Sequence, residues 1–199
     1  MRTFDYYGLR EASWDAEILS FVAQISVYKG KQDLYLREKP AELRRLVEVA
    51  KIQSTDSSNR IEGIGTSNAR MRQLVEKRTA PRNRDEQEIA GYRDVLSTIH
   101  ESYEHIPLTS DVLLQLHRDL LAYTDMTFGG KFKNTRNHIS EIHADGTSSI
   151  RFTPLEPFMT PMAVDAICEQ YRRALEEHMV NPLILIPIFI CDFLCIHPF

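Results

Sequence analysis

The chain has 199 residues, 43% of them hydrophobic and 26% charged, a composition typical of one globular domain with a sizeable core. Its 24 lysines and arginines against 28 aspartates and glutamates give a net charge of -4, which excludes an overall basic field for nucleic acid or anionic membrane. The most apolar run is shorter than the about 20 residues that span a bilayer, and the N-terminus has no apolar core for export. We therefore expect a cytoplasmic protein that binds neither membrane nor nucleic acid.

The first third of the chain predicts helical scaffold. Apolar residues at helical spacing from about 14 to 28 indicate an amphipathic helix that ends near Gly30. A second helix is expected after Pro40, since proline suits a first helical turn. We expect residues 1–80 to form an N-terminal helical region.

A polar stretch follows from Ser54 to Gly63, of the kind found in loops and helix caps. If Ser57 or Ser58 caps a short helix that Gly63 ends, Glu62 falls in the last turn. There the helix dipole disfavours a carboxylate by a few tenths of a kcal/mol. A solvated surface glutamate is the competing interpretation.

Four further helices follow from apolar stripes and capping residues. Their stripes are expected to form core and not a cofactor site. The helices are signalled by Met71, Leu74 and Val75; by Ile89, Tyr92, Leu96, Ile99 and Tyr103; by Thr109 or Ser110 before Leu113, Leu116, Leu120 and Leu121; and by Thr160-Pro161 before Val164, Ile167, Tyr171 and Leu175.

One stretch indicates β structure. Residues 137–143 and 148–152 flank Asp145-Gly146, a pair that favours a tight hairpin turn. An isolated hairpin is marginal in water, so it must lie against the helices or meet a partner.

The chain closes with His197 directly before Pro198, at the end of an apolar stretch that begins near residue 181. The proline ring restricts the preceding backbone, which predicts that a helix ends at His197. An imidazole titrates near pH 6.5 and accepts a proton under physiological conditions. A hydrogen-bonded, partly buried histidine is the commoner role for such a residue.

The segment Ile196-His197-Pro198-Phe199, preceded by Phe193, resembles the start of the signature motif of Fic-domain (Fic/DOC) proteins. In that family His-Pro-Phe is followed by an acidic residue, Gly-Asn-Gly-Arg and a further arginine, whereas this sequence stops at Phe199. Three other segments resemble the family in the same chain order. They are Ser58 to Gly63, similar to the Ser/Thr-x-x-x-Glu-Gly inhibitory helix; Glu88 to Tyr92, similar to the opening core helix; and Gly130 to Lys133 with Asn137, His138, Ile139, Phe152, Thr153 and Pro154, similar to the flap.

The resemblance implies an all-α, mainly helical bundle with one β-hairpin flap, whose core over residues 81–199 is truncated at the signature motif. It implies a protein adenylyltransferase that moves AMP from ATP to a protein hydroxyl. His197 is the expected base within His197-Pro198-Phe199, and Ser58, Glu62 and Gly63 carry the expected inhibitor. ATP and Mg²⁺ are the expected cofactors. The Mg²⁺ carboxylate is expected beyond Phe199, with no metal ligand among the site residues.

The same resemblance implies that the flap edge pairs with the backbone of a protein substrate bearing a Ser, Thr or Tyr hydroxyl, the protein itself included. Lys133 stands where the family usually has arginine. A homodimer is compatible with these expectations. We expect a protein that ends at Phe199 to be inactive in AMP transfer, because the anion-binding half of the motif follows that residue.

Two other classes of function stay open at this point. One is a binding or regulatory module without catalysis, which would hold a partner without affinity for ATP and Mg²⁺. The other is a Fic-type phosphotransferase that moves a different phosphate-containing group.

Overall fold

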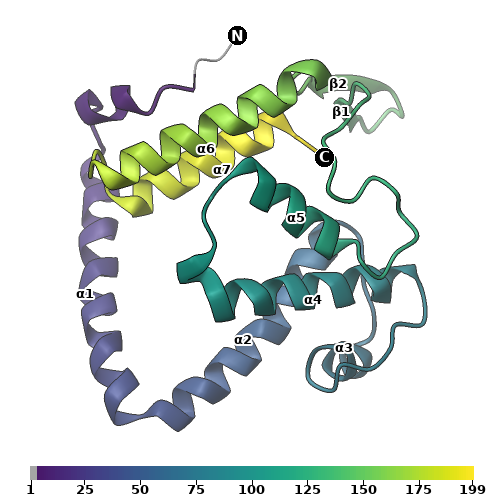
Figure 1. The fold of residues 1–199 in the computed structure, drawn as a ribbon, viewed down its shortest axis with the longest axis horizontal. Helices are drawn as coiled ribbons and strands as arrows, with labels where there is room; N and C mark the ends of the chain where they lie inside the picture. The colour runs from purple at the N-terminus through teal and green to yellow at the C-terminus, as the bar shows by residue number, and fades with distance from the viewer. Residues whose placement is uncertain (1–3) are drawn as a thin grey trace. The chain divides into compact units, whose positions relative to one another are not determined.

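The structure is a computed structural model that describes residues 4–199, without the side chains of residues 33, 37 and 40. The described chain is mostly helical and carries one antiparallel hairpin (Figure 1). The helices and strands are α1 (Ala16–Glu38), α2 (Pro40–Ile61), α3 (Asn68–Val75), α4 (Arg84–Ser102), α5 (Ser110–Leu120), β1 (Ile139–Ile142), β2 (Ser148–Phe152), α6 (Thr160–Glu176) and α7 (Pro182–Ile196), with short 3-10 helices at Tyr7–Glu11, Tyr103–His105 and Pro157–Met159. The prediction of a helical fold with a single hairpin is confirmed.

The chain forms two compact units. The first comprises residues 4–12, Pro107–Leu114 and Gly130–Phe199. Its main feature is the antiparallel pair α6 and α7, which lie side by side (Figure 1). Val164 and Ile167 from α6 and Ile196 from α7 are fully buried in its core.

The start of each helix of this pair follows from local sequence. Pro161 stands in the first turn of α6 and Pro182 in the first turn of α7, where the missing N–H would have no helical partner. The Asn181 side chain caps α7 by accepting a hydrogen bond from the Leu183 N–H at 2.9 Å. Asn181 and Pro182 thereby define where α7 begins, and the helix then runs to His197.

The second unit comprises Ser13–Ile106 and Gln115–Gly129, so α5 takes part in both units. Within it α2 packs against α4, and α3 packs against both of them. Its buried cluster is formed by Met71, Leu74 and Ile89, which were expected as core. The predicted helices around these residues are therefore confirmed as α3 and α4.

The first helix differs from the prediction. α1 continues through Gly30 to Glu38, because glycine weakens a helix interior by about 1 kcal/mol but ends a helix only where the chain turns left-handed. Apolar side chains of α1 that were expected on a buried stripe, such as Phe21 and Ile25, are exposed. The expectation of an amphipathic helix ending near Gly30 is wrong.

The polar stretch after Ser54 is also different from the expectation. Residues 54–61 are the last turns of the continuous helix α2, so neither Ser57 nor Ser58 caps a separate short helix. The buried side chains of Thr55 and Asn59 bond back to carbonyls of the preceding turn, at 2.8 Å each, which lets polar residues remain helical.

The end of α2 follows the prediction. Gly63 has a φ of +76°, a left-handed conformation that suits glycine, and Ile64 donates its N–H to the Asn59 carbonyl at 2.9 Å. Glu62 is the C-cap residue. The inhibitory-type segment therefore ends α2 and is not a helix of its own.

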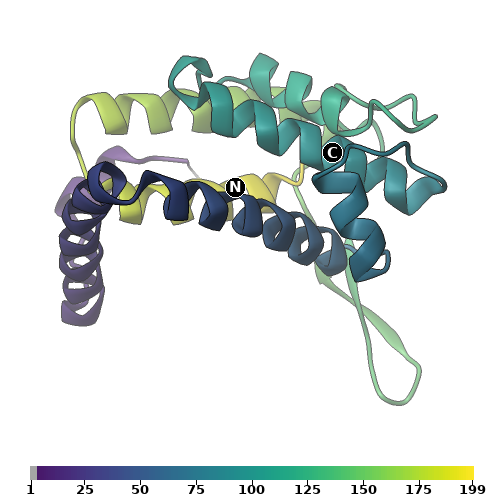
Figure 2. The same ribbon diagram turned by 90° about the horizontal axis from the view of Figure 1, so that it is seen from below.

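The hairpin pairs Ile142 with Ser148 next to the turn and Ile139 with Phe152 at its base, with an irregularity after Ile139. Gly146 in the turn has a φ of +83°, as the Asp-Gly pair predicted. All side chains of both strands are exposed. Figure 2 shows the hairpin extending away from α6 and α7, the helices of its own unit.

Candidate functional site

His197 lies at the C-terminal end of α7, as the sequence predicts. Its N–H donates to the Phe193 carbonyl at 2.9 Å and closes the last turn. The residue then leaves the helix in the left-handed region, with φ 50° and ψ 68°. Its neighbours Ile196 and Pro198 are buried, whereas His197 itself is half-buried. The imidazole therefore stands on a fixed backbone and is accessible in part.

Lys133 bonds to the backbone on both sides of this histidine. Its ammonium donates to the Ile196 carbonyl at 2.8 Å, and its backbone N–H donates to the Pro198 carbonyl at 2.8 Å. The ring of Phe132 stacks on Phe199, with centroids 6.2 Å apart and an interplanar angle of 8°. The segment before the flap thereby holds the predicted signature residues His197-Pro198-Phe199 in place.

The same ammonium reaches the base of the flap. Lys133 Nζ donates to Asn137 Oδ1 at 3.0 Å, shortly before β1 begins. Burial lowers the pKa of the Lys133 ammonium, and the Glu156 carboxylate opposes that shift. Sequence inspection noted only that Lys133 replaces the family's usual arginine, because the Ile196 and Pro198 carbonyls to which it donates lie far along the chain.

The predicted flap residues fall into two groups. Ile139 and Phe152 face each other at the base of the hairpin, and both are exposed, as are His138 and Thr153. The other two predicted flap residues are less accessible: Asn137 is half-buried and Pro154 is buried. They anchor the flap where it joins the first unit. The hairpin has backbone groups and side chains open to a partner along its length.

The predicted inhibitory residues belong to the second unit, whereas His197 belongs to the first. Glu62 and Gly63 are exposed at the end of α2. The hydroxyl of Tyr92 on α4 donates to Ser58 Oγ at 2.9 Å, which ties the end of α2 to α4. This contact joins Ser58 to the Glu88–Tyr92 segment that resembles the opening core helix.

Residues 107–199 match the family model of the Fic/DOC family. This part of the chain is a Fic domain. The matched residues include α5, the hairpin, α6, α7 and His197, whereas the segment with Glu62 lies before them.

The fold of this Fic-domain protein is similar to that of a crystallised Fic domain containing signaling protein from Bacteroides thetaiotaomicron. The two share 23% sequence identity and a TM-score of 0.69 over 81% of this chain. This chain covers 60% of the length of that protein. No curated protein matches the chain.

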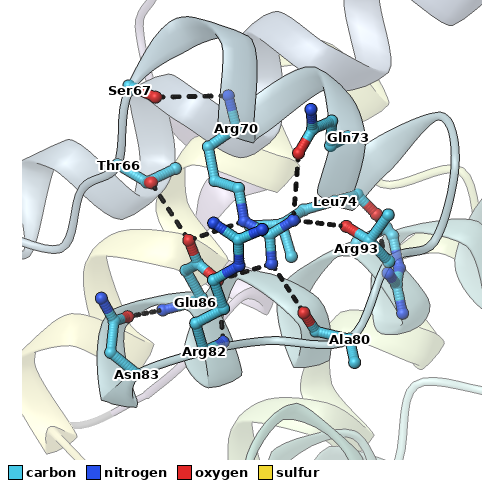
Figure 3. A network of polar contacts seen from close by, with 11 residues as sticks. Thr66, Ser67, Arg70, Gln73, Leu74, Ala80, Arg82, Asn83, Glu86 and Arg93 are labelled. Carbon is cyan, nitrogen blue, oxygen red and sulfur yellow. Dashed lines mark hydrogen bonds and ion pairs between the residues drawn. The ribbon is translucent and has the colours of Figure 1, made fainter.

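A buried ion pair fixes the second unit of the Fic-domain protein (Figure 3). The Arg70 guanidinium on α3 donates to both carboxylate oxygens of Glu86 on α4, at 2.8 Å each. Arg70 also bonds the Ala80 carbonyl, and Glu86 accepts from the Arg82 N–H, so the loop between the helices is held. Sequence inspection missed the pair, since each residue looks like an ordinary charged position on a helix. We assign it a structural role.

Among the side chains that the structure describes, no group of three or more His, Cys, Asp or Glu residues could hold a metal ion. Of the three cysteines, Cys168 is buried, Cys195 is half-buried and Cys191 is exposed. Within the same described part of the chain, no helix has both the length and the apolar character needed to cross a membrane.

Proposed function

We propose that this Fic-domain protein is a protein adenylyltransferase, in which His197 is the base and Glu62 restrains the reaction. The observation that carries the proposal is the position of His197. It lies at the end of α7 inside the family-matched residues, and Lys133 bonds to the backbone on both sides of it. It also follows the flap in the chain, as the signature histidine does in the family.

The proposed chemistry uses the imidazole as a proton acceptor. A protein hydroxyl is a poor nucleophile until its proton is removed. His197 takes that proton while the hydroxyl oxygen forms a bond to the α-phosphorus of ATP, and the bond to the β-phosphate oxygen breaks. AMP is thereby joined to the protein, pyrophosphate leaves, and the imidazolium afterwards releases its proton to water. Mg²⁺ and arginines, when bound or present, neutralise the negative charge that develops on the phosphates.

The exposed hairpin supports a protein substrate. A free strand edge binds an extended segment through backbone hydrogen bonds, with little dependence on the sequence of that segment. The Lys133 ammonium links the base of the hairpin to the carbonyl before His197. A target strand paired with the hairpin would therefore be bound to the same element that Lys133 connects to the backbone of His197, the proposed proton acceptor.

The proposed restraint uses the end of α2. Glu62 is exposed at a helix C-terminus, where the dipole disfavours a carboxylate and therefore favours its pairing with a cation. In the family the corresponding glutamate pairs with the second arginine of the signature, which keeps the ATP γ-phosphate from its productive position. We assign Glu62 the same part by resemblance.

The experiment that tests this function measures transfer of label from α-labelled ATP to protein, with the protein produced from its own gene. Glu62→Gly should raise self-labelling by about tenfold or more, because a charge-assisted contact contributes about 1.5–3 kcal/mol. His197→Ala should abolish labelling. Glu76→Gly is the matched control, since Glu76 is an exposed C-cap glutamate on α3 and its loss should change nothing.

Equal labelling of wild type, Glu62→Gly and His197→Ala would contradict the assignment. Label transferred from γ-labelled but not α-labelled ATP would favour the phosphotransferase. Partner binding through the hairpin without any affinity for ATP and Mg²⁺ would favour the non-catalytic module, which the exposure of both strands also permits.

A further inference from the structure

We infer that Lys133 is a positioning residue that fixes the backbone of His197 and couples it to the base of the hairpin. That Lys133 fixes the His197 backbone is an inference about this chain alone. Its expected effect on AMP transfer rests on the proposed function, and the experiments below test the two separately.

The first step of the argument is the pair of hydrogen bonds that surround His197. The Ile196 carbonyl, before the histidine, accepts from Lys133 Nζ, and the Pro198 carbonyl, after it, accepts from the Lys133 N–H, both at 2.8 Å. One residue therefore holds two points of the chain with His197 between them. The orientation of the imidazole is set by the backbone that these bonds restrain.

The second step is the conformation that is restrained. His197 has a φ of 50°, which is uncommon for a residue with a Cβ atom, and the following proline disfavours compact backbone further. Such a backbone persists only where the surrounding structure fixes it. The Lys133 bonds, together with the stacking of Phe132 on Phe199, supply that restraint.

The third step is charge. Carbonyls at the end of α7 carry the negative end of the helix dipole, so a cation is favourable there. An ammonium has three donors on a flexible stem, and Lys133 uses them for two acceptors of different kinds, the Ile196 carbonyl and the Asn137 side chain. The same cation thus connects the end of α7 to the segment that enters β1. A displacement of the hairpin base at Asn137 is therefore transmitted through the Lys133 ammonium to the backbone before His197.

The first test measures amide hydrogen exchange by NMR in the 199-residue chain. Lys133→Met removes the ammonium and keeps most of the stem, and it should speed exchange at the His197 amide by about tenfold or more. Lys133→Arg keeps a cation and should restore exchange to within about threefold of wild type. Lys77→Met, at an exposed lysine of the second unit, should leave the His197 amide unchanged. Unchanged exchange at His197 in Lys133→Met would overturn the inference.

A second measurement shows whether Lys133→Met has unfolded the first unit. If Lys133→Met also exposes the buried α6 residues Val164 and Ile167 to exchange, the unit has unfolded and the variant no longer reports on His197. The deciding observation is then a scalar coupling across the hydrogen bond from Lys133 Nζ to the Ile196 carbonyl in the wild-type chain. Its presence supports the inference, and its absence overturns it.

The third test concerns catalysis in protein that transfers label. Lys133→Met should lower kcat by about tenfold or more while the KM for ATP stays within about twofold, and Lys133→Arg should recover most of kcat. A raised KM with unchanged kcat would overturn the positioning role. If wild type transfers no label at all, the proposed function fails, whereas the exchange result at His197 stands on its own.

Discussion

His197 adopts a backbone conformation that glycine takes up without steric cost and other residues do not. The residue therefore combines strain with a half-buried imidazole. Strained residues of this kind gather at functional sites, where the surrounding structure holds them. Here the holding contacts come from the segment before the hairpin, in the same compact unit.

This strain predicts a difference in stability between two variants that both lack the imidazole. His197→Gly should be more stable than His197→Ala by about 1 kcal/mol, because glycine removes the Cβ atom from a left-handed position. Urea unfolding of the two purified variants measures the difference. Equal free energies of unfolding would show that the left-handed backbone stores no such cost.

The environment of Glu86 predicts how the stability of the protein depends on pH. Hydrogen bonds from Arg70 lower the pKa of the Glu86 carboxyl, burial opposes the shift, and the Arg82 N–H adds to the lowering. Because the folded pKa is lowered, the ion pair contributes stability that is fully present above the unfolded value of 4.5. That stability is lost as the pH falls through the lower folded value.

We expect Glu86→Gln to lower the melting temperature at pH 7 by about 5–10 °C, because removing one partner leaves a buried charge without its counterion. The variant should also lose part of the decline in stability that wild type shows below pH 4.5. Melting curves of both proteins from pH 7 down to about pH 3 measure this. Parallel curves for the two proteins would contradict the role given to the pair.

At the scale of elements, close helix contacts depend on residues without side chains. Gly91 on α4 lies against the backbone of Leu120 at the end of α5, and a Cβ atom at Gly91 would overlap the Leu120 carbonyl. Gly30 lies inside α1 and has open space around its position. A side chain is therefore excluded at Gly91 but has room at Gly30.

Gly91→Ala should destabilise the protein by about 1–3 kcal/mol or more, since the overlapping atom is backbone and α4 and α5 must separate. Gly30→Ala should stabilise it by up to about 1 kcal/mol through helix propensity. Chemical unfolding of the pair gives both values. A neutral Gly91→Ala would mean that the two helices are not held at this contact.

At the scale of the whole chain, the protein has two compact units with separate buried clusters. The first carries the hairpin, His197 and the cation that joins them. The second carries the α2 end with Glu62 and the Arg70–Glu86 pair. α3 and α4, which flank residue 80, lie together in the second unit. The division of the chain at residue 80 stays a prediction.

The sequence by itself determined the features that local physics controls. Helical periodicity identified α3 to α6, the Asp-Gly pair identified the hairpin turn, and Pro198 identified the helix end at His197. Each depends on neighbours within a few residues. The order of the motifs also indicated the Fic family before any contact was known.

Only the tertiary structure decided the rest. The bonds of Lys133 to the chain around His197, the Arg70–Glu86 pair and the close approach at Gly91 all join residues that are distant in sequence. The course of α1 through Gly30 and the inclusion of the Ser58 segment in α2 reflect longer helices whose continuation local signals did not favour. Such features depend on which surfaces meet, and periodicity and capping residues carry no information about that.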